Sequence, residues 1–218
     1  MPTLHQVTAY TFDELSPTAK ERAREWMREG ERELWDGEFV LEDAARICEL
    51  LGINLSTHAV KLHGGGTRYD PDIWYSGFCS QGDGASFTGQ YSHKKGSAKA
   101  IQEYAPLDTE LHRIGRGLLA LQAKYAYKLR ATIRQISSHH SHEYTVTADA
   151  ELDTAREDWT VTPEDEEALL TLFRDLMRWI YKTLEAEYEY QLGDAQIDEA
   201  IRANEYAFTE GGSRSTIL

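Results

Sequence analysis

The sequence contains few residues that cross-link a small fold or that interrupt its helices and strands. Its 218 residues include only 2 cysteines, 5 prolines and 3 methionines. Cys48 and Cys79 fall in different expected elements, so we predict two buried thiols in a reducing cytoplasm and no disulfide framework. Linkers rich in Pro and Ser, internal repeats and low-complexity tracts are also missing. This absence favours one domain over residues 1–218, with a mobile tail at 211–218.

Long apolar runs are missing as well. No segment approaches the ~20 apolar residues that a membrane span needs, and residues 1–12 have neither the basic start nor the apolar core of a secretory signal. We therefore predict a cytoplasmic protein with no membrane partner. Hydrophobic residues still make up 41% of the chain, which excludes a wholly disordered protein.

Positive charge is scarce, because 23 Lys and Arg face 37 Asp and Glu, for a net charge of −14. An acidic chain repels nucleic acid over a Debye length of about 8–10 Å, so we expect no non-specific nucleic-acid binding. The charge is uneven: residues 94–134 carry 9 basic and 3 acidic side chains, whereas residues 135–218 carry 6 and 19. Either the basic segment neutralises the acidic one within the chain, or it receives an acidic partner or a phosphate.

Apolar spacing and capping residues predict an α+β fold, with two long helices and shorter N-terminal helices packed on a small antiparallel sheet. Ser16-Pro17 starts a first helix, and residues 39–51 form a second. One long helix is expected over 107–136, from an apolar residue at every third or fourth position, and the other over 163–192. A shorter helix follows Gly193, and strands are expected at 7–12, 54–63, 73–93 (a hairpin turning at 81–84), 143–152 and 206–210.

The most unusual stretch is a glycine-rich segment among aromatic residues, at 74–89. Glycines let backbone N–H groups approach a phosphate closely, and aromatic walls suit a nucleotide-like ligand. No P-loop or dinucleotide-binding pattern accompanies the segment, and the competing interpretation is a hairpin whose glycines serve turn geometry and close packing. The candidate ligand site comprises Trp74, Ser76, Phe78, Ser80, Gln81, Gly82, Asp83, Gly84, Ser86 and Phe87, with Lys94 and Lys95 as countercharges.

Three histidines, His139, His140 and His142, lie close together before an expected strand. They offer some of the three or four ligands that Zn²⁺ needs, which makes a metal-dependent enzyme one hypothesis. The alternative is a polar connection between a helix and a strand. Cys79 has no evident base beside it, so we assign no catalytic residue and no cofactor.

The start of the chain and its glycine-rich segment resemble an uncharacterised family of small bacteriophage and prophage proteins. The resemblance covers most of the chain. It implies a phage origin and supplies no catalytic residue. The residues that carry it are Tyr10-Thr11-Phe12-Asp13-Glu14-Leu15-Ser16 followed by Ala19, Lys20, Ala23 and Trp26, and the motif SGF-x-SQGDGASF-x-G at 76–89.

Three functions remain open. The first is a phage-encoded acidic interaction protein that binds a bacterial host protein or defence complex and inhibits or redirects it, as a nucleic-acid mimic would. Its candidate surface is the helix face with Glu185, Glu187 and Glu189. The second is a binder of a nucleotide signal through residues 74–95, and the third is the metal-dependent enzyme. The apolar seam over 107–136 packs on the later helix or on a second copy, so both monomer and homodimer are possible.

Overall fold

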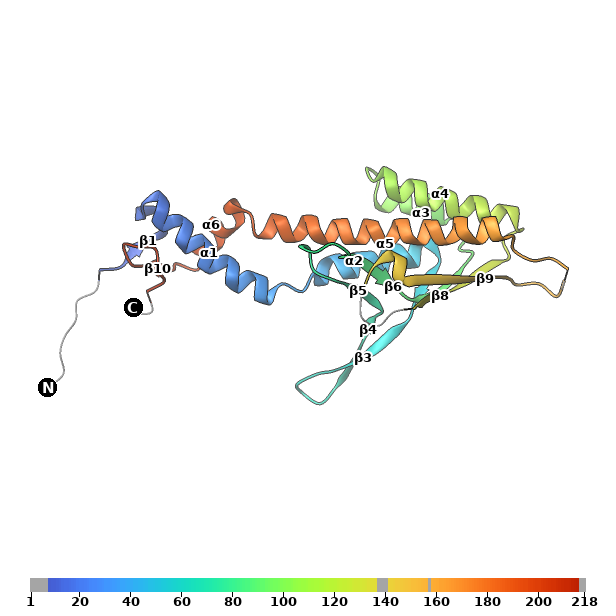
Figure 1. Ribbon diagram of the computed structural model, residues 1–218, viewed down its shortest axis with the longest axis horizontal. Helices are drawn as coiled ribbons and strands as arrows, with labels where there is room; N and C mark the ends of the chain where they lie inside the picture. Colours follow the sequence, from blue (N-terminus) through green and yellow to red (C-terminus); the bar gives the residue numbers. More distant parts are fainter. Residues whose placement is uncertain (1–7, 137–140, 157, 216–218) are drawn as a thin grey trace. The chain divides into compact units, whose positions relative to one another are not determined.

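The computed structural model in Figure 1 describes residues 8–136, 141–156 and 158–215 and confirms the α+β class. Of the helices in these ranges, none combines the length and the apolar character that crossing a membrane requires. The chain divides into two compact units: unit 1 comprises Met1–Gly37 and Glu185–Leu218, and unit 2 comprises Glu38–Leu184. Residues 1–218 are one folding domain only if the two units unfold together. The single domain therefore stays a prediction.

Unit 1 is built from both ends of the chain. Strand β1 (Tyr10–Thr11) pairs antiparallel with β10 (Ala207–Phe208), beside the short turn η1 (Phe12–Glu14). Helix α1 (Pro17–Leu34) begins as predicted, since Ser16 Oγ accepts a hydrogen bond from the Ala19 N–H at 3.3 Å. Together with helix α6 (Asp194–Ala203) these elements enclose a small core of Phe12, Leu15, Ala19, Ala23, Ile197, Ile201 and Phe208.

The centre of unit 2 is a four-stranded antiparallel sheet in the order β2-β7-β8-β9. Helix α5 (Pro163–Gln191) covers one face, because Phe173 meets Tyr91 of β7 with ring centroids 5.4 Å apart. Residues 185–191 of this helix belong to unit 1. The four strands are β2 (Ile53–Leu55), β7 (Gly89–Ser92), β8 (Leu129–Gln135) and β9 (Val146–Leu152).

Two further hairpins and three helices complete unit 2. Strand β3 (Thr57–Lys61) pairs with β4 (Thr67–Pro71), and β5 (Ile73–Tyr75) pairs with β6 (Ala85–Phe87). The predicted hairpin that turns at 81–84 is therefore confirmed as β5–β6, whereas residues 89–92 join the four-stranded sheet. The helices are α2 (Glu38–Leu51), α3 (Ser97–Tyr104) and α4 (Thr109–Lys124), and the short turn η2 (Glu143–Thr145) precedes β9.

The long helix predicted over 107–136 is wrong in its second half. Helix α4 ends at Lys124, and Ala126 and Tyr127 then adopt φ angles of 50° and 63°. The Tyr127 N–H donates to the Gln122 carbonyl at 2.7 Å, and the buried Gln122 amide donates to the Leu129 carbonyl at 2.8 Å. These two bonds reverse the chain into strand β8 without any glycine or proline to mark the turn.

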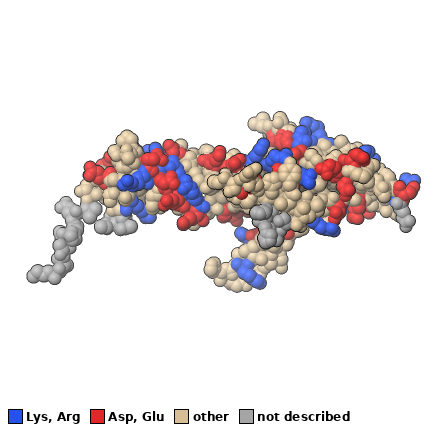
Figure 2. All heavy atoms as spheres, viewed as in Figure 1, with Lys and Arg blue, Asp and Glu red and all other residues tan. Residues whose placement is uncertain are grey.

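Ion pairs within unit 2 join the basic segment 94–134 to the acidic residues that follow it. Arg113 lies beside Asp175, Lys124 beside Asp165 and Arg130 beside Asp153. Arg134 and Asp149 form a fourth pair across strands β8 and β9. Figure 2 shows blue and red atoms side by side over this part of the surface. The predicted partial neutralisation within the chain is thus confirmed for these four pairs.

Only one of the two cysteines is buried as predicted. Cys48 is completely buried on α2, and Cys79 is exposed in the loop that follows β5. Both thiols are free. The prediction for Cys79 was wrong because residues 76–84 form a turn at the surface, whereas the sequence pattern suggested a continuous strand up to residue 80.

Candidate functional site

The glycine-rich segment forms a tight loop between β5 and β6. Asp83 closes this loop, since its Oδ2 accepts hydrogen bonds from the Cys79 N–H at 2.9 Å and the Ser80 N–H at 2.7 Å. Gly84 packs so closely on His142 that a Cβ at this position would come within 2.8 Å of the imidazole Cδ2. These contacts give Asp83 and Gly84 roles in turn geometry and packing, as the structural interpretation expects.

The remaining polar residues of the predicted ligand site divide into inner and outer groups. Ser76 Oγ accepts a hydrogen bond from the Gly84 N–H at 2.9 Å, and Ser86 is buried, with no hydrogen-bond partner for its hydroxyl in the described residues. Ser80 and Gln81 are exposed at the tip of the loop, beside Gly82. Within the glycine-rich segment, the exposed polar side chains of the predicted site are therefore those of the loop tip.

The aromatic residues of the segment pack against other parts of the protein, although Trp74 and Phe78 are only half-buried. Phe87 is fully buried. The Phe78 ring packs at a tilt of 38° against Tyr181 of α5, with ring centroids 5.6 Å apart, and Trp74 stacks on His58 at 6.4 Å. The aromatic side chains therefore fix the loop on α5 and on strand β3.

The two lysines predicted to neutralise a phosphate belong to another part of unit 2. Lys94 Nζ donates to the Glu49 carbonyl at 2.8 Å and reaches Glu49 Oε1 at 3.3 Å. Lys95 is exposed just before α3. Within the described ranges no hydrogen bond or ion pair joins either lysine to the glycine-rich loop. The predicted ligand site therefore lacks the positive charges expected beside it, and the site itself stays a prediction.

Of the three candidate metal ligands, His139 and His140 lie outside the described residues. The Nδ1 atom of His142 lies 3.1 Å from the Oε2 of the buried Glu143, and its ring stacks on Tyr144. The other Glu143 oxygen accepts hydrogen bonds from the Arg178 guanidinium at 3.2 and 3.3 Å. No group of three or more His, Cys, Asp or Glu side chains that could hold a metal ion occurs in the described part of the chain.

The three glutamates of the predicted partner surface lie on the last turns of α5, in unit 1. A step of two residues rotates about 200° around a helix, so Glu187 lies opposite the face that Glu185 and Glu189 share. Glu187 Oε1 also accepts a hydrogen bond from Gln191 Nε2 at 2.7 Å. At most two of the three carboxylates can therefore contribute to one surface.

Unit 1 holds most of the excess negative charge. It carries 16 Asp and Glu against 7 Lys and Arg, a net charge of −9. Unit 2 carries 21 against 16, a net charge of −5, although it contains about twice as many residues. Unit 1 therefore attracts positive charge more strongly than unit 2 does.

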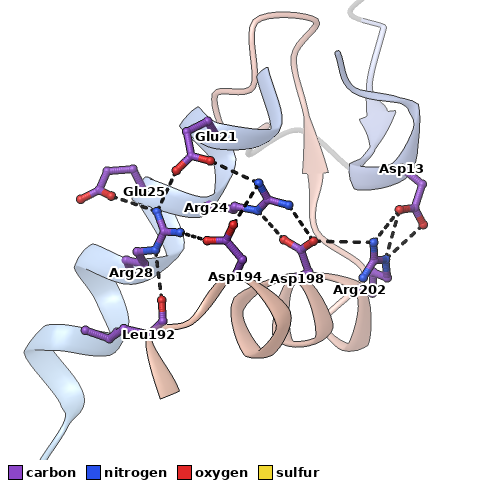
Figure 3. Close-up of polar contacts among 9 residues, drawn as sticks. All are labelled: Asp13, Glu21, Arg24, Glu25, Arg28, Leu192, Asp194, Asp198 and Arg202. Carbon is purple, nitrogen blue, oxygen red and sulfur yellow. Dashed lines mark hydrogen bonds and ion pairs between the residues drawn. The ribbon is translucent and has the colours of Figure 1, made fainter. Parts of the chain in front are cut away.

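A network of ion pairs between α1 and α6 uses some of these acids (Figure 3). Arg24 binds Asp198 with two hydrogen bonds, of 2.7 Å from Nε and 2.9 Å from Nη2. Arg28 donates to Glu21 at 3.0 Å and also bonds Asp194. Hydrogen bonds from these arginines lower the pKa of the Asp198 and Glu21 carboxyls below their usual values. The network holds the two helices of unit 1 together.

The next turns of α1 carry carboxylates without such partners. Glu29, Glu31 and Glu33 form no ion pair with a Lys or Arg in the described residues, although Glu21 and Glu25 on the same helix do. All three border a cavity of about 360 Å³. We call this feature the acid-rimmed cavity; it is lined by Trp26, Met27, Glu29, Gly30, Glu31, Glu33, Leu34 and Tyr206.

The floor of the acid-rimmed cavity is apolar and open. Leu34 is 79% exposed, and it continues the stripe of Trp26 and Met27 beyond the core of unit 1. Gly30 lies in the middle of the stripe, and apart from its own helix backbone and chain neighbours no atom of the described residues lies within 4 Å of where its Cβ would be. A glycine inside a helix costs about 0.5–1 kcal/mol relative to alanine, so this gap is maintained at the expense of helix stability.

Two aromatic residues that line the cavity also contact a cation of the protein itself. The guanidinium of Arg214 stacks over Tyr206 and Trp26, with its Cζ 4.4 and 4.9 Å from the two ring centroids. The segment 211–215, expected in a mobile tail, forms a turn fixed by a 2.8 Å hydrogen bond from the Ser215 N–H to the Ala207 carbonyl. Residues 216–218 lie outside the described residues. The aromatic pair thus has the geometry that a basic side chain prefers.

Sequence reasoning did not identify this cavity. Trp26 and Met27 follow helical spacing and are expected to pack in a core, and both are only partly buried. The signal in the sequence is the continuation of their stripe through Gly30 to Leu34. Tyr206 is far away in the chain, so its place in the wall depends on a tertiary contact that no local pattern encodes.

The family model described as Domain of unknown function (DUF8835) matches residues 12–194. The matched range contains helix α1 and the whole of unit 2, and it ends at the first residue of α6. No curated protein and no solved structure matches the chain. The comparisons therefore assign a family and leave the activity to be inferred from the structure.

Proposed function

This chain belongs to the DUF8835 family, and we propose that it is an acidic interaction protein that binds a basic segment of a partner protein in the acid-rimmed cavity. One observation carries the proposal. Three carboxylates that form no ion pair with a Lys or Arg of the described ranges, Glu29, Glu31 and Glu33, surround an apolar floor in the more acidic of the two units.

The cavity suits long basic side chains in both shape and chemistry. Lys and Arg place an aliphatic stem on an apolar surface and keep the charged group in contact with water or with anions. A volume of about 360 Å³ accommodates such stems on Trp26, Met27 and Leu34, and the charged groups then reach the rim. Burial of a leucine as exposed as Leu34 stabilises a complex by about 1.5–3 kcal/mol.

The rim glutamates act mainly on encounter rate and choice of partner. Exposed charges of one sign attract a partner of the opposite sign over about 8–10 Å and reject acidic ones. Glu185 and Glu189 of α5 add to the negative charge of the same unit. Binding is therefore expected to weaken steeply as salt concentration rises.

A more specific form of the proposal concerns the origin of the partner. The start of the chain and the motif at 76–89 resemble phage and prophage proteins. This resemblance favours a phage-encoded protein whose partner is a bacterial host protein or defence complex in the host cytoplasm. If the basic segment held in the cavity is one that normally contacts nucleic acid, its capture would inhibit or redirect that partner.

The two other hypotheses have less structural support. The nucleotide-ligand hypothesis loses Asp83 to the closure of its own loop and Lys94 to Glu49. The metal hypothesis retains one described histidine, His142, which contacts Glu143. The acid-rimmed cavity, in contrast, combines a hollow with carboxylates that form no ion pair in the described residues.

The test compares two triple variants with the same loss of charge. The first, E29Q/E31Q/E33Q, neutralises the rim. The control, E199Q/E205Q/E210Q, neutralises three exposed acids of unit 1 that do not line the cavity. Each tagged protein is incubated with nuclease-treated bacterial lysate, washed over a salt gradient and analysed by mass spectrometry.

The expected result is a basic protein that the wild type and the control retain at low salt and that the rim variant loses. Retention of the same proteins by the rim variant would refute the assignment of the cavity. Binding that does not change between low and high salt would refute the electrostatic mechanism, whichever variant is used.

A further inference from the structure

The hairpin β3–β4 projects from the rest of unit 2 (Figure 1). Uncharged side chains cover most of its surface in Figure 2, and Tyr69 is 69% exposed and Leu62 48% exposed. A two-stranded hairpin with few contacts to the rest of a protein is at best marginally stable in water. Exposed aromatic and aliphatic side chains on such an arm indicate that another surface covers it.

The outer edge of strand β4 is open, because β3 is its only partner strand in the described residues. The Asp72 N–H donates to the Ser56 carbonyl at 2.8 Å, and the Leu62 N–H donates to the Gly66 carbonyl at 3.0 Å. In an antiparallel pair such bonds recur at every second residue. The backbone groups of Arg68 and Asp70 therefore face β3, and those of Thr67, Tyr69 and Pro71 face outward.

The sequence of this edge is complementary to itself. We infer that β4 pairs antiparallel with β4 of a second copy of this chain, around a two-fold axis at Tyr69. The two Tyr69 residues then exchange N–H···O=C bonds. Each Thr67 N–H donates to the Pro71 carbonyl of the second copy, so that the missing N–H of Pro71 removes only one bond per side.

The side chains select this register over its neighbours. With Tyr69 opposite Tyr69, Arg68 lies opposite Asp70 of the second copy, and this pair occurs twice. A two-fold axis at Arg68 would oppose two arginines, and an axis at Asp70 would oppose two aspartates. Directly opposed like charges destabilise strand pairing, whereas opposite charges and paired aromatic rings stabilise it.

In the single chain Arg68 already has acidic neighbours. Its guanidinium contacts Asp70 at 2.6 Å and Glu38 at 3.4 Å, and its side chain is still 54% exposed. It can therefore reach an aspartate of a second copy without uncovering a buried charge. The dimer does not depend on the proposed binding function; where both hold, one particle carries two acid-rimmed cavities and binds a repeated partner more tightly.

The test is a charge exchange between two variants. R68E places a new carboxylate opposite Asp70 of the second copy, and D70K places a new ammonium group opposite Arg68, so each variant opposes like charges. When the two variants are mixed, the new carboxylate opposes the new ammonium group, and the remaining Arg68 opposes the remaining Asp70. K128E is the control, because Lys128 is exposed in the same unit, away from the hairpin, and forms no ion pair in the described residues.

The mass in solution is measured by sedimentation equilibrium from about 1 to about 500 μM, with circular dichroism to verify that each variant is folded. We expect a concentration-dependent dimer for the wild type and K128E, a dissociation constant at least about tenfold higher for each single variant, and recovery in the equimolar mixture. A monomeric wild type at every concentration, or folded single variants whose mixture does not recover, would overturn the inference. A monomer would mean that Arg68, Asp70 and Pro71 protect the edge from pairing.

Discussion

Unit 1 closes around seven buried hydrophobic residues, whereas 28 such residues lie in unit 2 among the residues that the structure describes. The charges differ in the same direction. Unit 2 has 16 basic side chains for its 21 acids, but unit 1 has 7 for its 16. Unit 1 thus combines a small core with unbalanced charge. This combination is costly for stability and useful for binding, and it fits the proposal that unit 2 stabilises the protein while unit 1 recognises a partner.

The largest effect is expected from truncation of one core residue in each unit. Phe208 is fully buried in unit 1, between Phe12 and Trp26, and Phe173 is fully buried in unit 2 against Tyr91. F208A and F173A should each cost about 3–5 kcal/mol. Because its core is small, unit 1 should open in F208A while unit 2 keeps its structure. Hydrogen exchange measured by mass spectrometry reports on each unit separately.

The F173A variant is the matched control for this comparison. Its exchange should increase first in unit 2, which carries the larger core. Loss of protection in both units at once, in both variants, would show a single cooperative domain over residues 1–218 and would remove the distinction between a stable and a weakly stable unit.

A smaller effect is expected from acid, because it acts on the ion pairs of unit 1. Hydrogen bonds from Arg24 and Arg28 lower the pKa of Asp198 and Glu21 below their usual values of 3.8 and 4.5. A lowered carboxyl pKa contributes stability that is fully present above the usual value and is lost as pH falls through the lowered one. The urea midpoint of unit 1, followed by NMR of amides in α1 and α6, should therefore fall below about pH 4.

The variant R24A separates this mechanism from general acid denaturation. The Arg24–Asp198 pair is partly buried and bidentate, so its loss should destabilise unit 1 by about 1–2 kcal/mol at pH 7. The variant should also lose part of the change between pH 5 and pH 3. An unchanged midpoint at pH 7, or an unchanged acid response, would show that other groups hold α1 and α6 together. R46A is the control, since the exposed Arg46–Glu49 pair should contribute no more than about 1 kcal/mol.

Local patterns predicted the elements whose apolar residues follow one period and whose ends are marked by capping or turn residues. Ser16-Pro17 and Thr162-Pro163 mark the starts of α1 and α5, and the turn at 81–84 lies between β5 and β6. In β8 the pattern is ambiguous. Leu129 and Ile133 are four residues apart, and a step of four keeps a side chain on one face of a helix and also on one face of a strand. Only Ala131, midway between them, distinguishes a strand from a helix, because it is buried on the same face. In the sequence, alanine is a weak signal of a buried position.

The acid-rimmed cavity was beyond the reach of local patterns for a different reason. The stripe of Trp26, Met27 and Leu34 is visible in the sequence, but a core helix would show the same stripe. The cavity arises because Gly30 leaves a gap and because Tyr206, from the other end of the chain, forms the wall. Likewise, Glu21 pairs with Arg24, three residues further along α1, whereas Glu29 forms no such pair with Arg32 in the described residues, so the same local spacing has two outcomes.

The smallest perturbation, alkylation of a single thiol, provides an independent measure of which unit opens. Cys79 is exposed, whereas Cys48 is buried in unit 2, where burial raises its pKa to about 12. Iodoacetamide at pH 7.5 should therefore modify one thiol in the native protein and both in urea, and modification of Cys79 should change stability by less than about 0.5 kcal/mol. In F208A, Cys48 should stay unmodified, because only unit 1 opens. Rapid modification of Cys48 in F208A would mean that the small core of unit 1 supports the large core of unit 2, and the division of roles between the two units would then be wrong.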